Sequence, residues 1–568
     1  MCGIIGGTKY DDIDNVKQGL KSIMHRGMDN NTIFHYTYHN HYISHNRLGI
    51  QDLSEKANQP MVSNDERFCL AFNGELWQSS FEKFDDELRE KYIFSTDKSD
   101  SELFLYYLIE NIDNLEDALR EIDGMFAFAL YDRHEDKTYL GRDFIGRIPL
   151  YYTYDGDHFA YCSEAKGLRV GVQTAYYKID VKSKYHKMKD VKHLETIFPV
   201  LPGHLITFTA DDAIRRYDMK TYVWYSFKDE YDRDKQSYYA RTDDEFKDFE
   251  SDDKGLKYYV DGFRDVLDKA VDNELISDVP VCTILSGGID STVITWLLSK
   301  KLPKVEAFVV NVNPLRKSKY KDDLYYARMA ADEFGITLHE VNVDRDDVAG
   351  FLDESIWASE TYKWTQVTPA VAQMFLAQHI QSKGYRVVFG GEGADEIFAS
   401  YGDVKRFCWN QPFYWNQKRI NLLNGLHKSN LVRTNKTMMY GGTVELRTPF
   451  LNKEVVDFGL RIPTKYRDEN YDKRKKIDYK TTEYADGNVM KYILRKAFEG
   501  DITDELLWRP KKTFQVGCHT DYLKKQEDMM YKKFGEYFVK GKGYEGFLNK
   551  LSHRVARIAV KRITVKEL

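Results

Sequence analysis

The stretch VPVCTILSGGIDS, residues 279–291, decides the fold of the second half of this chain. Val279–Leu285 is an apolar run of strand length, and Thr292–Lys300 has the periodicity of a helix. Two glycines between them allow the backbone to approach a phosphate closely, and the start of the helix offers free N–H groups and its positive dipole end. The stretch therefore predicts a strand, an anion-binding turn and a helix.

Alternating strands and helices continue toward the carboxyl terminus. The candidate strands are Val305–Val312, Thr337–Val343 and Arg386–Phe389, and Leu324–Phe334 is a candidate helix. This alternation predicts an α/β domain with a parallel sheet and right-handed crossovers. Ligands on such sheets bind at the carboxyl ends of the strands. A second glycine turn, residues 390–396, follows the last strand, so both turns fall where a nucleotide would lie.

The first turn has the spacing SGGxDS, which is neither the Walker spacing nor the dinucleotide fingerprint. It matches the pyrophosphate-binding loop of enzymes that cleave ATP between the α and β phosphates. Asp290 and Asp395, one from each turn, would hold Mg²⁺, which needs only one or two protein carboxylates. Lys491 would balance the leaving pyrophosphate. The alternative is two ordinary acidic helix starts and a surface lysine.

The amino terminus carries a second chemical signal, Met1-Cys2-Gly3-Ile4. Removal of Met1 would give Cys2 both a thiol and a free α-amine, and the amine would serve as the base that activates the thiol. The two groups titrate closely enough for a proton to pass between them at cellular pH. The alternative is a small apolar residue that packs in a core.

The rest of the chain gives weaker signals. The first part, to about residue 210, predicts buried sheets covered by helices. Residues 226–255 are dense in charge without apolar periodicity and predict a solvated connection, and the basic tail from Lys540 to Lys566 predicts a solvated helix. The candidate strands and helices of the first part are Phe68–Phe72, Met125–Tyr131, Leu205–Phe208, Val16–Ile23 and Glu102–Ile109.

The composition indicates a globular protein of more than one domain. The 568 residues exceed what one hydrophobic core usually holds, and hydrophobic residues make up 42% against 30% charged. A net charge of −6 leaves no overall basic field for nucleic acid or anionic lipid. The sequence shows no apolar run of membrane-span length and no charged-then-apolar leader, and its six cysteines form no CxxC pair. These features predict a cytoplasmic protein that binds neither nucleic acid nor membrane.

An amino-terminal Cys-Gly-Ile together with SGGxDS resembles the glutamine-hydrolysing asparagine synthetases. The resemblance implies an α+β amino-terminal domain of the N-terminal-nucleophile hydrolase type with αββα layers. An α/β domain of the PP-loop ATP pyrophosphatase type, similar to the adenine nucleotide alpha hydrolases, would follow. The amino-terminal half is similar to a class II glutamine amidotransferase through His25-Arg26-Gly27, Asn46-Arg47-Leu48, Gln59-Pro60-Met61, Asn73-Gly74-Glu75, Ser99-Asp100-Ser101-Glu102, Arg142-Asp143 and Ser163-Glu164-Ala165-Lys166.

The same resemblance implies four segments: an amidotransferase domain at 2–210, a charged connector at 211–255, an asparagine synthetase domain at 256–540 and a basic tail at 541–568. In the first domain, Cys2 would attack the side-chain amide of glutamine and form a thioester. Asn73 and the backbone N–H of Gly74 would form the oxyanion hole. The implied glutamine-binding residues are Arg47, Leu48, Gly49, Ile50, Gln51, Asn73, Gly74, Glu75 and Asp100.

Within that set, Arg47 would bind the substrate α-carboxylate and Asp100 its α-ammonium. An Arg and an Asp at separate positions are also what any zwitterionic amino acid requires, although the two residues would equally suit an ordinary surface ion pair.

In the second domain the resemblance implies that ATP activates aspartate as β-aspartyl-AMP, which ammonia from the first site then attacks. Glu392 would take part in adenylate formation. A dry passage between the sites is implied, because protonated ammonia is no nucleophile. The implied ATP-binding residues are Leu285, Ser286, Gly287, Gly288, Asp290, Ser291, Val310, Gly390, Gly391 and Lys491, with Mg²⁺ on Asp290 and Asp395. The implied small-molecule partners are glutamine, aspartate and ATP, and a homodimer is one possibility.

Several residues depart from the usual family pattern. Gly390 replaces a common serine, and Asn435 and Asn452 stand where aspartates are usual. These positions lie in the half that selects the acceptor, whereas the thiol and the SGGxDS loop are unaffected. Two alternatives therefore stand beside asparagine synthesis. One is the same chemistry on another carboxylate, such as a sugar acid or a peptide, and the other is a scaffold or regulatory protein without turnover.

Overall fold

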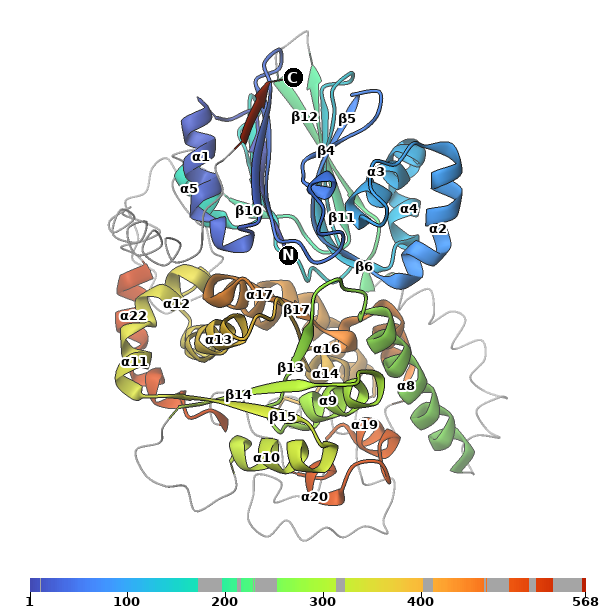
Figure 1. The fold of residues 1–568 in the computed structure, drawn as a ribbon, viewed down its shortest axis with the longest axis vertical. Helices are drawn as coiled ribbons and strands as arrows, with labels where there is room; N and C mark the ends of the chain where they lie inside the picture. Colours follow the sequence, from blue (N-terminus) through green and yellow to red (C-terminus); the bar gives the residue numbers. More distant parts are fainter. Residues whose placement is uncertain are drawn as a thin grey trace.

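The computed structural model describes residues 1–10, 12–171, 197–211, 216–227, 229, 253–312, 322–401, 412–463, 466, 490–509, 517–534 and 564–567. Most of the predicted connector and of the predicted basic tail therefore lie outside the described residues. The amino-terminal half lies above the carboxyl-terminal half in Figure 1, and the N-terminus lies where the two halves meet.

Two sheets and two groups of helices form the amino-terminal half. The first sheet is β10 (Phe198–Pro199), β8 (Tyr151–Tyr154), β9 (Phe159–Cys162), β1 (Gly3–Gly7), β3 (His41–Arg47), β2 (Asn30–Tyr36) and β18 (Thr564–Glu567), in spatial order. The second is β12 (Arg216–Val223), β11 (His204–Asp211), β7 (Lys137–Arg142), β6 (Gly124–Asp132), β5 (Phe68–Leu76) and β4 (Met61–Val62).

Helices cover the outer face of each sheet, which gives the αββα layers that the resemblance implies (Figure 1). The helices α1 (Ile13–Ser22) and α5 (Ala165–Gly171) lie beside the first sheet, and α2 (Gln78–Lys91), α3 (Asp100–Glu110) and α4 (Leu115–Glu121) lie beside the second.

The central strands of this half confirm the predicted buried runs. β5 and β6 pair antiparallel over their full length, with Phe68 opposite Asp132 and Leu76 opposite Gly124. Every residue of both strands is buried, because each strand has the other sheet on one side and helices on the other. The predicted helices correspond to α1 and α3.

Two strands fall where the sequence predicted a connector or a helix. β12 lies inside the segment predicted to be a connector, and its tyrosine and methionine residues alternate with charged ones, as in an edge strand with one face on a core. The density of charge obscured that alternation. β18 pairs in parallel with β2, so the described end of the tail is a strand rather than the expected helix.

The carboxyl-terminal half is an α/β domain, as predicted. Its sheet has the order β15 (Thr337–Val343), β14 (Glu306–Val312), β13 (Val281–Ile284), β16 (Val387–Phe389) and β17 (Glu445–Arg447), and every neighbouring pair is parallel. β13 and β16 are neighbours with Val281 opposite Val387, so the two glycine turns leave the same edge of the sheet.

The helices of this half cover both faces of the sheet (Figure 1). They are α8 (Asp253–Asn273), α9 (Ile289–Lys301), α10 (Asp323–Phe334), α11 (Arg345–Gly350), α12 (Leu352–Ser359), α13 (Trp364–Ser382), α14 (Ala394–Ile397), α16 (Pro412–Gly425), α17 (Asn430–Gly442), α18 (Lys453–Arg461), α19 (Tyr492–Ala497), α20 (Asp504–Leu507) and α22 (Glu527–Phe534).

The two halves share one apolar core and several buried ion pairs. The largest hydrophobic cluster runs from Cys2 and Trp77 in the first half to Leu267 in the second. The Met1 ammonium binds Glu445 Oε2 at 2.8 Å, and Arg147 Nη1 binds Glu274 Oε1 at 2.9 Å, all four groups being buried. The junction is therefore packed like a protein interior.

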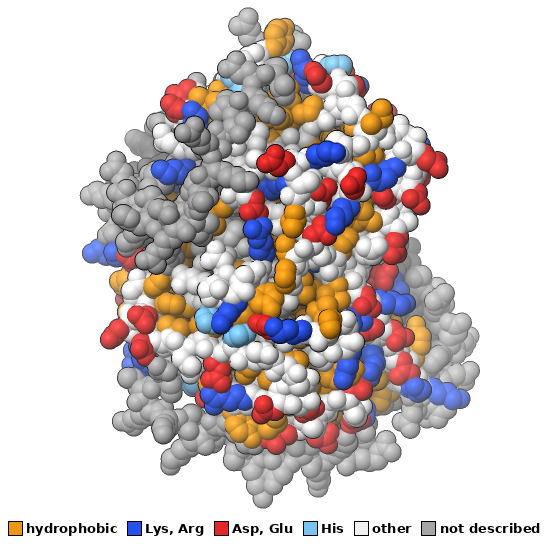
Figure 2. Space-filling model, viewed as in Figure 1, with side chains coloured by type: hydrophobic (Ala, Val, Ile, Leu, Met, Phe, Trp, Pro, Cys, Tyr) orange, Lys and Arg blue, Asp and Glu red, His pale blue; other side chains and the backbone are white. Residues whose placement is uncertain are grey.

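Charged side chains of both signs are interspersed over the face shown in Figure 2, in keeping with the small net charge of −6. Among the described helices, none combines the length and apolarity needed to cross a bilayer.

Candidate active sites

The Cys2 thiol lies at the junction of the two halves, just before β1. The Cys2 N–H donates to Asn73 Oδ1 at 2.7 Å, and the Cys2 carbonyl accepts from Arg26 Nε at 2.8 Å. The Leu48 N–H donates a hydrogen bond to Cys2 Sγ at 3.4 Å. Glu164 fixes Arg26 through a bond of 2.8 Å from Nη1. The structure thus brings together residues of motifs that lie far apart in the sequence.

The thiol needs a base. Burial raises the pKa of Cys2 to about 11, although the Met1 ammonium and the Leu48 N–H partly offset this effect. Such a thiol is almost entirely protonated at neutral pH, and the thiolate is the nucleophile. Met1 is fully buried in the structure, with its ammonium on Glu445. Without Met1, the α-amine would belong to Cys2 itself and could take the thiol proton.

Gly74 occupies a position that only glycine fits. Its φ is 153°, and a Cβ there would collide with the Met125 carbonyl on the neighbouring strand β6. The adjacent Asn73 is fully buried, and its Nδ2 lies 3.4 Å from Ser163 Oγ. The Asn73 side-chain amide and the backbone of the buried Gly74 lie near the thiol and are groups that can stabilise an oxyanion.

Arg47 and Asp100 are buried and do not form the surface ion pair considered above. Arg47 donates to the Ser54 carbonyl at 2.7 Å, to Asn58 Oδ1 at 2.9 Å and to the Asp52 carbonyl. Asp100 accepts from the Leu76 N–H at 3.2 Å. Burial raises the pKa of Asp100 to about 6, although hydrogen bonds from Leu76 and Ser101 lower it.

Two further residues of the predicted glutamine set contact each other. Gln51 Nε2 donates to Glu75 Oε2 at 2.5 Å and to the Leu76 carbonyl at 3.3 Å. Burial, Glu445 and Asp100 raise the pKa of Glu75 well above its usual range.

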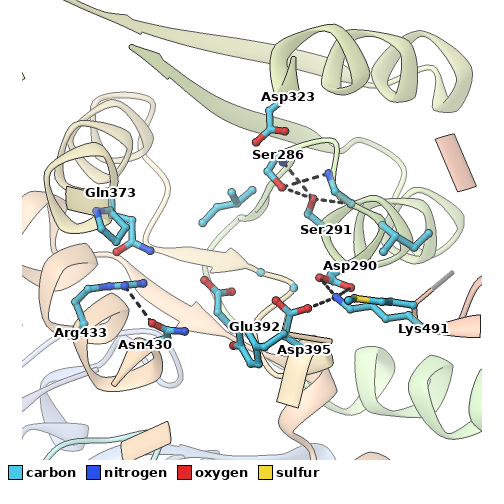
Figure 3. A pocket seen from close by; sticks show the side chains of 18 of the residues that line it. Ser286, Asp290, Ser291, Asp323, Gln373, Glu392, Asp395, Asn430, Arg433 and Lys491 are labelled. Atoms are coloured by element: carbon cyan, nitrogen blue, oxygen red, sulfur yellow. Dashed lines mark hydrogen bonds and ion pairs between the residues drawn. The ribbon is translucent and has the colours of Figure 1, made fainter. Parts of the chain in front are cut away.

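The second site is a cavity of about 410 Å³ at the carboxyl ends of β13 and β16 (Figure 3). Predicted residues that line it are Ser286, Gly288, Asp290, Ser291, Gly390, Gly391, Glu392, Asp395 and Lys491. Leu285, Gly287 and Val310 are not among its lining residues, and Leu285 and Val310 are buried in the apolar cores.

The SGGxDS turn is organised by its own serines. Ser291 Oγ lies 3.0 Å from Ser286 Oγ and accepts from the Ser286 N–H at 3.1 Å. Gly287 has a φ of 68°, which suits glycine. A Cβ on Gly391 would lie 2.7 Å from the Asp290 Cβ, so the two glycine turns touch.

Asp290 and Asp395 converge on one cation. Lys491 Nζ lies 2.6 Å and 2.5 Å from the two Asp290 oxygens and 2.5 Å from Asp395 Oδ1. Burial lowers the pKa of Lys491, but the two carboxylates raise it by more, so the pKa lies above its usual value. Within the described residues, no group of three or more His, Cys, Asp or Glu side chains is arranged for a metal. Because Mg²⁺ is usually bound through one or two protein carboxylates and keeps several waters, Asp290 and Asp395 would be enough to hold it.

The opposite wall of the cavity was missed by sequence reasoning. It is formed by Gln366 and Gln373 of α13 and by Asn430 and Arg433 of α17 (Figure 3). Arg433 donates to Gln366 Oε1 and Asn430 Oδ1, both at 3.3 Å. Burial lowers the pKa of Arg433 to about 10, although Glu392 raises it. No motif marks these residues, because they come from separate helices.

Comparisons with known proteins match each half of the chain to a family. Residues 1–223 match the family described as glutamine amidotransferase domain, and residues 262–424 and 411–549 match the family described as asparagine synthase. The chain is 26% identical over 545 residues to asparagine synthetase B (glutamine-hydrolyzing) of Escherichia coli strain K12, with 92% of this chain and 83% of the relative covered.

Two fungal proteins are similarly related. Identity is 28% over 561 residues to the probable asparagine synthetase (glutamine-hydrolyzing) of Schizosaccharomyces pombe, covering 93% of this chain and 86% of the relative. The identity is also 28% over 572 residues to asparagine synthetase (glutamine-hydrolyzing) 1 of Saccharomyces cerevisiae, covering 92% of this chain and 86% of the relative.

Proposed function

The chain belongs to the asparagine synthase family and carries an amino-terminal glutamine amidotransferase domain, and from this membership we propose that it makes asparagine from aspartate, ATP and the amide nitrogen of glutamine. One observation carries the proposal. A buried thiol at residue 2 and a nucleotide-sized cavity behind an SGGxDS turn occur in one packed molecule.

In the first half-reaction, Cys2 Sγ attacks the side-chain amide carbon of glutamine. The α-amine of Cys2, freed by removal of Met1, takes the thiol proton and passes it to the departing ammonia. Asn73 and Gly74 stabilise the oxyanion, and Arg47 and Asp100 bind the two charged ends of the amino acid. Water then hydrolyses the thioester and releases glutamate.

In the second half-reaction, the β-carboxylate of aspartate attacks the α-phosphate of ATP, and pyrophosphate leaves. The loop residues Ser286, Gly288 and Ser291 face the cavity and would bind phosphate oxygens. Asp290 and Asp395 would hold Mg²⁺, which neutralises phosphate charge when bound; their convergence on the Lys491 ammonium supports a cation site there. Ammonia attacks the adenylate carbonyl and AMP leaves.

We propose that the amidotransferase domain runs from residue 2 through β12, beyond the boundary at 210 that the sequence indicates, because β12 belongs to its second sheet. The synthetase domain then begins with α8. A cytoplasmic location and a homodimer stay predictions, the latter to be tested by the molecular mass in solution.

The variant Cys2→Ala tests the proposal. It removes the nucleophile, so glutamine-dependent synthesis should be abolished, while synthesis from added ammonium should stay within about twofold of wild type because the second site is untouched. Asparagine, glutamate, AMP and pyrophosphate are measured with each nitrogen donor. Cys69→Ala, which alters a cysteine buried in β5, is the matched control and should retain both activities.

Equal loss of both activities in Cys2→Ala would contradict two separate sites. Pyrophosphate release that does not depend on aspartate would instead favour another carboxylate as the acceptor.

A further inference from the structure

The segment Gly49–Asp52, which follows Arg47 and Leu48, is held by the other half of the molecule. The Gly49 carbonyl accepts from Arg386 Nη1 at 3.1 Å, and the Gly49 N–H donates to Asp29 Oδ2 at 2.8 Å. Arg386 also binds Asp29 with two bonds, of 2.6 Å and 3.2 Å. One end of the segment is therefore fixed by an aspartate of its own half and an arginine of the other half.

Asp278 fixes the other end of the segment. The Asp278 N–H donates to the Ile50 carbonyl at 2.9 Å, and the Asp52 N–H donates to Asp278 Oδ2 at 2.8 Å. Lys98 Nζ binds the second carboxylate oxygen at 2.5 Å. Asp52 has a φ of 48°, which a non-glycine residue adopts only where its surroundings hold it.

This segment in turn sets the position of Arg47. Arg47 Nη2 donates to the Asp52 carbonyl, and Nη1 donates to the Ser54 carbonyl at 2.7 Å. A shift of Asp52 would therefore move the guanidinium group. Lys98 lies two residues before Asp100, so Asp278 also contacts the chain next to the proposed ammonium-binding carboxylate.

The sheet connects these contacts to the nucleotide cavity. Asp278 lies three residues before β13, and Arg386 directly precedes β16. The two strands are parallel neighbours, and their carboxyl ends lead into the turns that carry Ser286 and Gly391. Residues just before these two strands thus contact the glutamine segment, and the turns just after the strands line the nucleotide cavity.

We propose that Asp278 and Arg386, both in the synthetase half, are positioning residues for glutamine: they hold Gly49–Asp52 in the conformation that directs Arg47 toward the substrate α-carboxylate. The inference rests on the proposed glutamine site. The Arg386 and Asp29 side chains are 39% and 35% exposed, so their ion pair contributes little to the stability of the fold. Its paired hydrogen bonds and the shared Gly49 contact fit a local orienting role.

The test uses Arg386→Ala and Asp278→Ala in the full-length protein, with steady-state kinetics for both nitrogen donors. We expect the KM for glutamine to rise about tenfold, with kcat within about threefold and ammonium-dependent synthesis unchanged. Arg386→Lys should recover most of the loss, because one ammonium in the place of Nη1 can reach both Asp29 and the Gly49 carbonyl.

The matched control is Arg328→Ala. Arg328 binds Glu340 with two bonds of 2.6 Å and 2.7 Å, is 56% exposed and lies on α10. Like Arg386 it makes a two-bond ion pair with a carboxylate, but it does not contact the glutamine segment, and all kinetic constants should stay at wild-type values.

Three results would overturn the inference: a glutamine KM within twofold of wild type in both alanine variants, an equal loss of ammonium-dependent synthesis, or a lysine variant no better than alanine. A wild-type protein that cannot use glutamine at all would instead overturn the proposed function. Comparison of wild type with the variants therefore separates the two failures.

Discussion

At the scale of single residues, Asp100 provides a pH test of the glutamine site. It is buried at the start of α3, and burial raises its pKa to about 6. The carboxyl group is therefore charged above that pH and neutral below it. Because binding of the α-ammonium needs the carboxylate, protonation of Asp100 should add about a tenfold loss per unit in kcat/KM for glutamine hydrolysis below pH 6, beyond the loss caused by protonation of the Cys2 α-amine.

The measurement is glutaminase activity between about pH 5 and 8 at constant ionic strength. Asp100→Asn has no charge to lose, so its kcat/KM should be low and should lack this acidic step. Wild-type and Asp100→Asn profiles that fall with the same slope below pH 6 would exclude Asp100 as the ammonium-binding group.

At the scale of elements, the two glycine turns depend on close contact. A Cβ at Gly391 would lie 2.7 Å from the Asp290 Cβ and 2.8 Å from the Ser291 backbone nitrogen, so the turns would have to separate. We expect Gly391→Ala to lower synthesis from either nitrogen donor about 100-fold, since a displacement of about 1 Å at reacting groups has that effect. Glutamine hydrolysis should persist.

Pyrophosphate release with ammonium and aspartate measures this effect. Gly425→Ala is the control, because a Cβ there meets no atom within 4 Å and should leave the rate unchanged. Normal pyrophosphate release by Gly391→Ala would mean that the two turns need not touch during the reaction.

Prediction from sequence succeeded where the information is local. The strand, turn and helix around SGGxDS are specified by adjacent residues, and β13 and α9 confirm them. β17 has only three residues, too few for a strand periodicity to reveal it. Asn452, which departs from the usual aspartate, caps α18 by accepting the Glu454 N–H at 3.0 Å, a role that both residue types perform.

The cavity wall from α13 and α17 could not be predicted for a different reason. Gln373 and Arg433 are sixty residues apart in the sequence and line the same cavity only because α13 and α17 pack against each other. The same applies to the contacts of Arg386 and Asp278 with the glutamine segment, because they depend on how the two halves dock. Residue types alone do not encode such long-range distances.

At the scale of the whole molecule, a line of buried charges crosses the junction. Glu164 binds Arg26 at 2.8 Å and also binds Lys166. Lys166 lies 3.5 Å from Glu360 of the second half, and Glu360 in turn binds Lys436 of α17. Burial would raise the pKa of Glu164, but Lys166, His25 and Arg26 hold it well below its usual range, so it is ionised at neutral pH.

The variant Glu164→Gln tests what this line of charges contributes. It would leave Arg26 and Lys166 buried without their shared carboxylate, and breaking a buried pair costs about 3–5 kcal/mol. We expect the midpoint of thermal unfolding to fall by at least about 5 °C, with glutamine use reduced further because Arg26 also anchors the Cys2 carbonyl. Glu87→Gln, which breaks an exposed pair with Lys91, should leave the midpoint unchanged. An unchanged midpoint in Glu164→Gln would show that the junction is held by its apolar core rather than by these charges.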